Sequence, residues 1–332
     1  MSAATLARLH GASVVRGVVL RLLTVPASLV LCMLAAHASA PQVKTQAPGF
    51  YRMMLGDFEI TALSDGTFDL DTSKMLTHVP REGLAPLLAR SFAGNIVPVS
   101  VNAYLINMGD RLILADTGAA GLFGPTLGRL ASSLLASGYR PEQVDAVILT
   151  HMHPDHVGGL LLEGRRAFPN ATVYAEHEEA DFWLGEAARA RAGTERQPFF
   201  IGAEQAIAPY LAAGRFQKFS APAEICPGVR AIAAPGHTPG HTLFSIESKG
   251  NRLVIWGDLM EIEAVQFSNP AVTIVFDENP AQTAAQRPRA YRDAAREKYF
   301  VAAAHLPFPG IGHVRAETTG YSWVPITYDI PR

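Results

Sequence analysis

The segment His151-Met-His-Pro-Asp-His156 constrains this chain more than any other, because it places three histidines and one aspartate within six residues. It follows directly on the apolar run Val144–Thr150, which has the length of a strand. Residues two apart face the same side of an extended backbone, so His151 and His153 can bind one metal ion together. Pro154 forces a turn, which directs the aspartate and the third histidine elsewhere, toward a second ion.

Four residues cannot complete two metal shells, so we expect further ligands from other parts of the chain. Each further candidate stands just past the carboxyl end of an apolar run: His237 in Pro235–His241 after Val229–Ala234, Asp258 after Arg252–Trp256, and His305 after the run that ends at Ala304. Proteins of the α/β class commonly place their sites at such strand ends. Imidazole and carboxylate suit Zn²⁺ and similar metals better than Ca²⁺ or Mg²⁺.

Apolar periodicity predicts strands that alternate with amphipathic helices, which indicates an α/β fold built in layers. Hydrophobic residues make up 48% and charged residues 17% of the chain, which excludes a disordered protein. Residues 41–52 look like an extended arm. Besides the runs named above, strands are expected at Phe58–Ser64, Asn102–Met108, Arg111–Asp116 and Thr242–Ser248, and helices near Leu127–Leu134, Glu176–Arg191, Glu204–Leu211 and Ala281–Lys298.

The first residues have the order of a secretory signal. Arginines without any acidic residue precede the apolar stretch Leu22–Ala36, and the small residues Ala36-His37-Ala38 close it. We therefore predict a signal peptide over residues 1–38 and one hydrolase domain over residues 39–332. A bilayer span needs about 20 apolar residues, so we expect no permanent membrane anchor and a periplasmic or secreted protein.

The composition and the motifs exclude some classes of partner and some classes of catalytic chemistry. The net charge is −2 and no basic run is present, so nucleic acid is not an expected partner. Of the two cysteines, Cys32 would leave with the signal, and Cys226 has no evident base partner. The nucleophile motif Gly-x-Ser-x-Gly is absent. Neither a serine nor a cysteine nucleophile is therefore expected.

The full set of motifs resembles the metallo-β-lactamase-fold superfamily, in its branch of dinuclear zinc hydrolases. Within that branch the likeness is greatest to methyl parathion hydrolase and its lactonase-like relatives. It extends over three longer segments, which are Ala47–Thr67, Asp116–Leu130 and Ala302–His313. The resemblance implies a single-domain αβ/βα four-layer sandwich, two metal ions in a cleft between the sheet edges, and a homodimer.

The resemblance also implies roles for individual residues. It places one metal on His151, His153 and His237, the other on Asp155, His156 and His305, and Asp258 on both. Asp116 matches an aspartate that orients the site, although a simple turn role before Thr117 is also open. The remaining histidines are expected to brace a loop (His241) or to be structural or exposed (His78, His177 and His313).

Two metal ions held about 3.5–4 Å apart lower the pKa of bound water to about 7. We expect the bridging hydroxide to attack a carbonyl carbon or a phosphorus atom, while the metals stabilise the oxyanion. The expected substrate is a neutral lactone, ester or phosphotriester. No general acid is evident, which favours leaving groups that depart as stabilised phenolates or enolates.

The resemblance brings an aromatic pocket onto Phe123, Trp183 and Phe199, which would suit a flat apolar ring; ordinary core packing is the alternative for these residues. Glu261, Ile274 and Phe276 depart from methyl parathion hydrolase and favour the lactonase-like relatives. The preferred hypothesis is a zinc hydrolase of lactones and aryl esters with promiscuous organophosphate triesterase activity. The alternatives are a dedicated organophosphate phosphotriesterase and a metal-binding protein without turnover. A β-lactamase is not expected, since Glu261 would repel a substrate carboxylate.

Overall fold

The computed structural model describes residues 40–79, 81–122 and 124–330. The predicted signal peptide and Phe123 lie outside these residues. Residues 40–45 are exposed and contain no helix or strand. The chain from Gln46 onward forms one compact unit. No helix in the described part of the chain is long and apolar enough to span a membrane.

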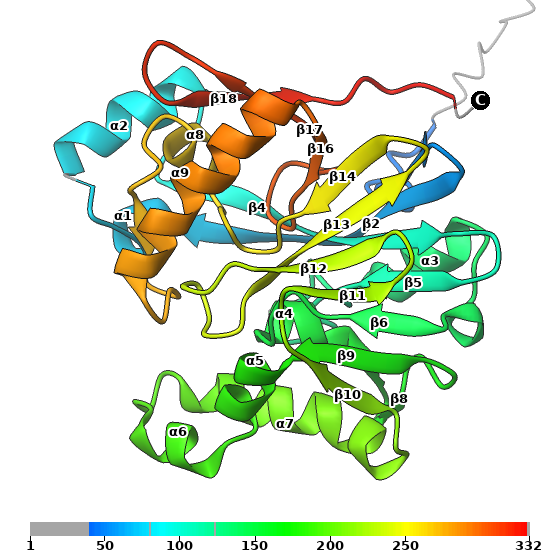
Figure 1. Ribbon diagram of the computed structural model, residues 1–332. Coiled ribbons are helices and arrows are strands. Elements are labelled where there is room, and N and C mark those ends of the chain that lie inside the picture. Colours follow the sequence, from blue (N-terminus) through cyan, green and yellow to red (C-terminus); the bar gives the residue numbers. More distant parts are fainter. Residues whose placement is uncertain (1–39, 80, 123, 331–332) are drawn as a thin grey trace, which may run out of the picture. The chain divides into compact units, whose positions relative to one another are not determined.

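Two seven-stranded sheets dominate the described residues of this unit (Figure 1). In spatial order, the first sheet contains β1 (Phe50–Leu55), β2 (Phe58–Asp71), β4 (Ile96–Asn107), β5 (Leu112–Ala115), β6 (Ala146–Ile148), β9 (Thr172–Glu176) and β10 (Phe216–Phe219). The second contains β11 (Ala223–Cys226), β12 (Val229–Ala233), β13 (Thr242–Ser248), β14 (Asn251–Ile255), β16 (Phe300–Ala302), β17 (Ile311–Ala316) and β18 (Tyr321–Pro325). Two short ribbons pair β3 (Leu76–Thr77) with β15 (Thr273–Ile274), and β7 (Leu161–Leu162) with β8 (Arg165–Arg166).

Helices cover the outer faces of both sheets. The helices of the described residues are α1 (Thr72–Met75), α2 (Arg81–Arg90), α3 (Leu130–Ala136), α4 (Pro154–Val157), α5 (His177–Trp183), α6 (Glu186–Arg191), α7 (Gln197–Ala212), α8 (Glu263–Gln266) and α9 (Pro280–Glu297), with 3-10 turns at Pro141–Gln143 and Gly158–Leu160. Apolar residues of α3, α5 and α7 pack on the first sheet, and those of α9 pack on the second. The order helix, sheet, sheet, helix confirms the predicted four-layer sandwich (Figure 1).

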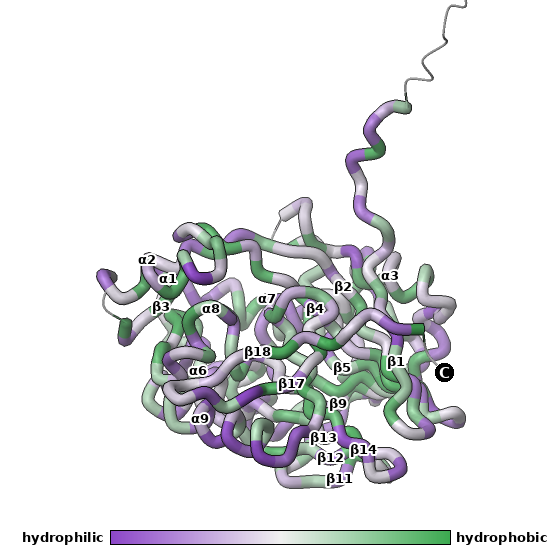
Figure 2. Tube along the Cα trace, turned by 90° about the horizontal axis from the view of Figure 1, so that it is seen from above, coloured by the Kyte–Doolittle hydropathy of each residue, from purple (hydrophilic) through white to green (hydrophobic). Residues whose placement is uncertain are grey.

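Strand β4 shows why the central strands are apolar on both faces. Tyr104 and Ile106 face the core between the two sheets, whereas Ala103 and Leu105 face the helices. Side chains alternate along a strand, so a sheet buried on both sides needs a continuous apolar run. Figure 2 shows apolar residues along the buried strands β5 and β9, whereas polar residues predominate along much of α9.

Three element predictions need correction. The expected arm at residues 41–52 ends as strand, because β1 begins at Phe50 and pairs with β2. The strand expected to stop at Ser64 continues to Asp71 through a bulge, where the buried Asp65 carboxylate accepts backbone N–H groups from another loop. The helix expected near Glu176–Arg191 is two helices, since α5 ends at Trp183 and α6 begins at Glu186 after the extended Gly185.

Candidate active site

The ends of strands from both sheets meet at one cluster of buried histidines and carboxylates. After β6 the chain passes His151 and His153 and enters α4, whose first residue is Pro154. Proline suits the first position of a helix, because its missing N–H has no partner there. Loops after β12, β14 and β16 bring the remaining residues of the cluster from the second sheet.

The described chain contains three groups of potential metal ligands, and two of them consist of the predicted ligands; the remaining one is His237, Glu261 and Asp277, which shares His237 with the first group below. The first group is His151, His153, His237 and Asp258, and the second is Asp155, His156, Asp258 and His305. Within each group the ligand atoms all lie within 4.8 Å of one another. All of these residues are buried except Asp155, which is partly exposed. The structure thus brings all seven predicted ligands together, and Asp258 belongs to both groups.

The Asp258 carboxylate lies between the two groups. Its Oδ2 atom is 3.6 Å from His151 Nε2 and 3.4 Å from His237 Nε2. The same oxygen is 3.0 Å from His305 Nε2, while Oδ1 is 3.1 Å from His156 Nε2. One carboxylate therefore contacts histidines of both groups.

Buried polar atoms without hydrogen-bond partners show whether this cluster is suited to bind cations. His151 Nε2 and His153 Nε2 are buried and have no hydrogen-bond partner among the described residues. A buried polar atom without a partner costs about 1–3 kcal/mol, and such atoms are rare in folded proteins. Divalent cations would satisfy them, and nitrogen and oxygen donors suit zinc-like metals. The residues present therefore fit two divalent cations.

The pKa shifts of several residues in the cluster also favour the binding of cations. Burial lowers the pKa of His151 and of His153 well below 6.5, which keeps both rings in the neutral form that binds metals. Burial also opposes protonation of His305, but the charge of Asp258 outweighs it and raises the pKa of His305 to about 9. The neighbouring histidines hold the pKa of Asp258 well below 3.8 despite its burial. The Asp258 carboxylate thus stays charged and attracts positive charge.

Polar groups behind the cluster hold three of its histidine rings. Asp116 Oδ2 lies 2.9 Å from His156 Nδ1, and this carboxylate also accepts the backbone N–H and the hydroxyl of Thr150. Asp277 Oδ1 lies 2.9 Å from His237 Nδ1. The backbone oxygen of Ser100 lies 2.7 Å from His305 Nδ1. Such contacts fix which nitrogen of each ring faces the metal.

A narrow cavity of about 50 Å³ opens beside the cluster. Its walls include six side chains beyond the ligands, which are Phe68, Leu70, Phe199, Glu261, Ile274 and Phe276. Four of these six were predicted. The other two, Phe68 and Leu70, were missed, although they alternate on β2 and so share one face.

Trp183 and Glu261 were both predicted to line the substrate pocket, and the structure places them differently. Trp183 does not line this cavity: its ring is 1% exposed and lies behind His153 and Phe199, at centroid distances of 5.1 and 6.3 Å. Glu261 lines the cavity, yet its Oε2 atom accepts a hydrogen bond from the Gln266 amide and lies 4.0 Å from Arg287. Burial raises the pKa of Glu261 to about 7.

The other histidines lie apart from the ligand groups or behind them. His241 accepts the backbone N–H of Asp258 at Nε2, and its Nδ1 lies 3.2 Å from the backbone oxygen of Ala234. It therefore braces the loop between β12 and β13. His313 lies 3.1 Å from the backbone oxygen of Tyr299, and His177 is exposed at the surface.

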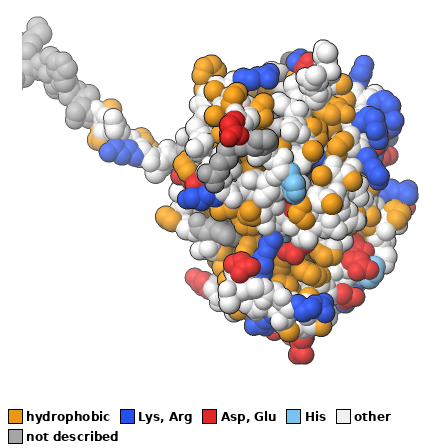
Figure 3. Space-filling model, turned by 90° about the vertical axis from the view of Figure 1, so that its left-hand side faces the viewer, with side chains coloured by type: hydrophobic (Ala, Val, Ile, Leu, Met, Phe, Trp, Pro, Cys, Tyr) orange, Lys and Arg blue, Asp and Glu red, His pale blue; other side chains and the backbone are white. Residues whose placement is uncertain are grey.

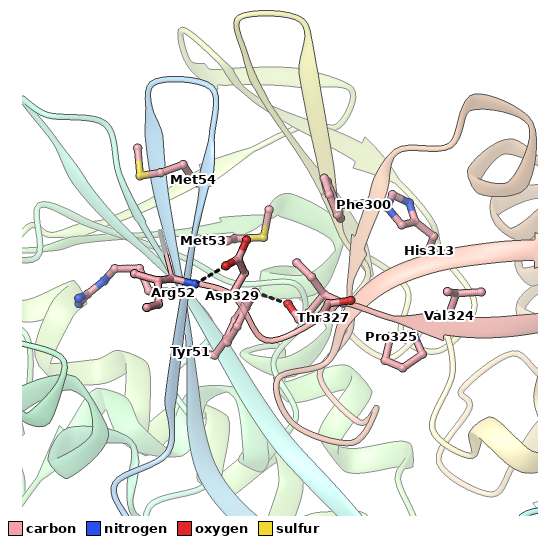
Figure 4. A pocket seen from close by; sticks show the side chains of 12 residues that line it. Tyr51, Arg52, Met53, Met54, Phe300, His313, Val324, Pro325, Thr327 and Asp329 are labelled. Atoms are coloured by element: carbon pink, nitrogen blue, oxygen red, sulfur yellow. Dashed lines mark hydrogen bonds between the residues drawn. The ribbon is translucent and has the colours of Figure 1, made fainter. Parts of the chain in front are cut away.

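A larger depression of about 550 Å³ lies between β1 and the strand pair β17–β18 (Figure 4). The hydroxyl of Tyr51 donates to the backbone oxygen of Thr327 across it. Arg52, His313 and Asp329 are among its lining residues, but they form none of the ligand groups found in the described chain. We therefore assign the candidate active site to the smaller cavity.

Comparison with known proteins agrees with this architecture. The model of the metallo-beta-lactamase superfamily matches residues 96–305. An N-acyl homoserine lactonase of Bacillus cereus is 28% identical over 184 residues, which cover 49% of this chain and 64% of that protein. The chain thus spans about 64% of the length of the curated relatives it first matches.

Two solved structures cover most of the chain. A hydrolase of the beta lactamase superfamily, AbOPH, is 39% identical with a TM-score of 0.82, and the match covers 86% of this chain and 100% of that one. AidC, a dizinc quorum-quenching lactonase, is 25% identical with a TM-score of 0.78, over 85% and 99% of the two chains.

Proposed function

This chain belongs to the metallo-beta-lactamase superfamily, and on that premise we propose that it is a zinc-dependent hydrolase of lactones and aryl esters. The observation that carries the proposal is the pair of buried ligand groups that share Asp258 and leave ring nitrogens without partners. When bound, two divalent cations acidify water and polarise the oxygen of an ester or phosphoryl group. Relatives described as lactonases support the lactone part of the proposal.

Three aspartates of the chain would hold the metal ligands in the correct orientation. Asp258 joins the two groups, and Asp116 and Asp277 fix the rings of His156 and His237. Cys226 takes no part, because it is buried in the core between the sheets. Cys226 is therefore not a candidate nucleophile, and we expect water to be the attacking group.

The cavity walls would select the substrate. Phe199 and Phe276 face each other at a centroid distance of 6.2 Å, and Ile274 closes the wall beside them. Drug-sized ligands occupy about 300–1,000 Å³, so a cavity of about 50 Å³ holds only the reactive end of a substrate. A planar lactone or ester group enters such a slot more easily than a tetrahedral phosphotriester with two alkoxy arms. Organophosphate hydrolysis is thus proposed as a side activity.

Apolar surface continues outside the cavity. Val275, between two lining residues, is 42% exposed. Hydrophobic side chains also gather on the face of the molecule that carries α1 and α2 (Figure 3). This surface favours substrates with an apolar tail, which a protein that only stored metal would not require.

The test is a kinetic panel of lactones, aryl esters and phosphotriesters on one zinc-loaded preparation. We expect the highest kcat/KM for a lactone or aryl ester. Equal or better turnover of a methyl parathion-like triester would favour a dedicated organophosphate phosphotriesterase instead. Two bound ions without turnover of any ester would favour a metal-binding protein.

Location and assembly belong to the same proposal. Residues 1–38 have the order of a signal peptide, so we propose export to the periplasm or beyond. The N-terminal sequence of the protein recovered from cell fractions tests this. The proposed homodimer is tested by the molar mass measured by light scattering.

A further inference from the structure

Glu179 of α5 is a buried carboxylate that the sequence did not single out. It is 1% exposed. Its Oε1 atom accepts the backbone N–H of Met152 at 2.7 Å and the indole N–H of Trp183 at 2.7 Å. Its Oε2 atom accepts the backbone N–H of Gly240 at 3.0 Å. One carboxylate thus joins three separate parts of the site.

Each of these donors is tied to a ligand of the first group. The Met152 peptide lies between His151 and His153. Gly240 lies in the same short loop as His237, three residues further on. The Trp183 ring contacts the ring of His153 edge to face at 5.1 Å. None of these three hydrogen bonds reaches a residue of the second group.

The contact at Gly240 is an independent sign that the loop must lie against Glu179. A Cβ atom at position 240 would stand 2.3 Å from the backbone nitrogen and 2.6 Å from the Cβ atom of Glu179. Real Cβ atoms do not approach backbone so closely. Only glycine therefore lets the loop reach the carboxylate, which explains the second glycine of Pro235–His241.

The geometry points to Glu179 as the positioning residue of the first ligand group, which holds His151, His153 and His237 in place for one cation. Asp116 has the corresponding position behind the second group, through His156 and Thr150. This inference rests on the proposed two-cation site. It goes further by placing a second buried carboxylate, besides Asp277, behind the first group.

The isosteric substitution Glu179→Gln isolates this role. An amide has only one acceptor oxygen, so an NH₂ group must face either the two donors at Oε1 or the N–H of Gly240. Groups that orient metal ligands change metal affinity by about 10–100-fold when they are altered. We expect Glu179→Gln to weaken the binding of one ion by this factor and to leave the other ion bound.

The experiment titrates the chelator-stripped protein with Zn²⁺ against a chromophoric chelator and records the visible spectrum with Co²⁺. Glu178→Gln is the matched control, because the same change is made one residue away on a side chain that is 64% exposed. The control should bind two ions like the parent. Asp116→Asn should weaken the other ion, and its Co²⁺ spectrum should differ from that of Glu179→Gln.

Parental affinity for both ions in Glu179→Gln, with an unchanged Co²⁺ spectrum, would overturn the assignment. Equal weakening of both ions would overturn it too, because it would indicate general destabilisation. If Glu179→Gln does not fold, Trp183→Phe removes a single donor and should weaken the same ion to a smaller extent; no effect there would reject the role. A parent that binds two ions but hydrolyses no ester would refute the proposed function and leave this assignment standing.

Discussion

His237 Nδ1 lies 2.9 Å from Asp277 Oδ1, while Nε2 of the same ring lies 3.4 Å from Asp258 Oδ2. The ring is therefore held at both ends by carboxylates from two different loops. Asp277 is itself fixed, because its Oδ2 atom accepts the backbone N–H of Ile274 at 3.0 Å. The wall of the cavity and the first ligand group are thus connected through one aspartate.

The substitution Asp277→Asn should weaken one metal ion by about 10–100-fold. An asparagine must turn its NH₂ group toward either His237 or the N–H of Ile274, so one of the two contacts is lost. Isothermal titration of the stripped protein with Zn²⁺ measures the effect. Asp293→Asn, at an exposed site on α9, should bind zinc like the parent. Equal affinities for the two variants would contradict the orienting role of Asp277.

The substitution Asp258→Ala should lower the occupancy of the second metal and reduce turnover by several orders of magnitude. It removes the one carboxylate that contacts both groups, so two cations would be less shielded from each other. Circular dichroism should show little change in fold. His313→Ala should keep its metal content, because His313 lies outside the ligand groups. Similar metal loss in both variants would show that the ligand assignment is wrong.

Removal of metal should abolish activity and lower the melting temperature together. A ligand that binds only the folded state stabilises it by about 2.7 kcal/mol at a concentration 100 times its dissociation constant. Metal analysis, activity and thermal melting before and after chelation measure both effects. Added Zn²⁺ or Co²⁺ should restore them. Full activity after exhaustive removal of metal would refute a dinuclear mechanism.

The substitution Phe276→Leu should raise the rate for a phosphotriester more than the rate for an aromatic lactone. Phe276 lines the cavity opposite Phe199, and a smaller side chain makes room for the alkoxy arms of the triester. One or two badly placed groups cost about 1–3 kcal/mol, which corresponds to roughly 10–200-fold discrimination. The ratio of the two kcat/KM values measures it. A ratio that does not move would exclude Phe276 as a selectivity residue.

Local patterns in the sequence were sufficient for the layered fold and for the short-range part of the cluster. The two-residue spacing of His151 and His153 needs only an extended backbone, and Pro154 starts α4 by its own geometry. Apolar runs such as Val144–Thr150 indicated strands by their length, because a run this short rarely forms a helix.

Pairing across the layers was decided by the tertiary structure. Glu179 and Gly240 are 61 residues apart, and His237 and Asp277 are 40 apart. The chain contains 30 acidic residues, and nothing in their local spacing shows which of them will face a buried donor. That choice depends on which loops meet when both sheets pack.

For the aromatic residues too, the sequence indicated burial, whereas tertiary packing decided which of them line the cavity. Trp183 carries an apolar ring that predicts burial, but only the packing of α5 places it behind His153 rather than on the cavity wall. Phe68 lines the cavity from the part of β2 that follows the register shift at Asp65, which the local sequence did not indicate. Sequence by itself determined which residues could bind metal and which segments would form strands. Tertiary structure decided which polar groups hold them, because these contacts join residues that are distant along the chain.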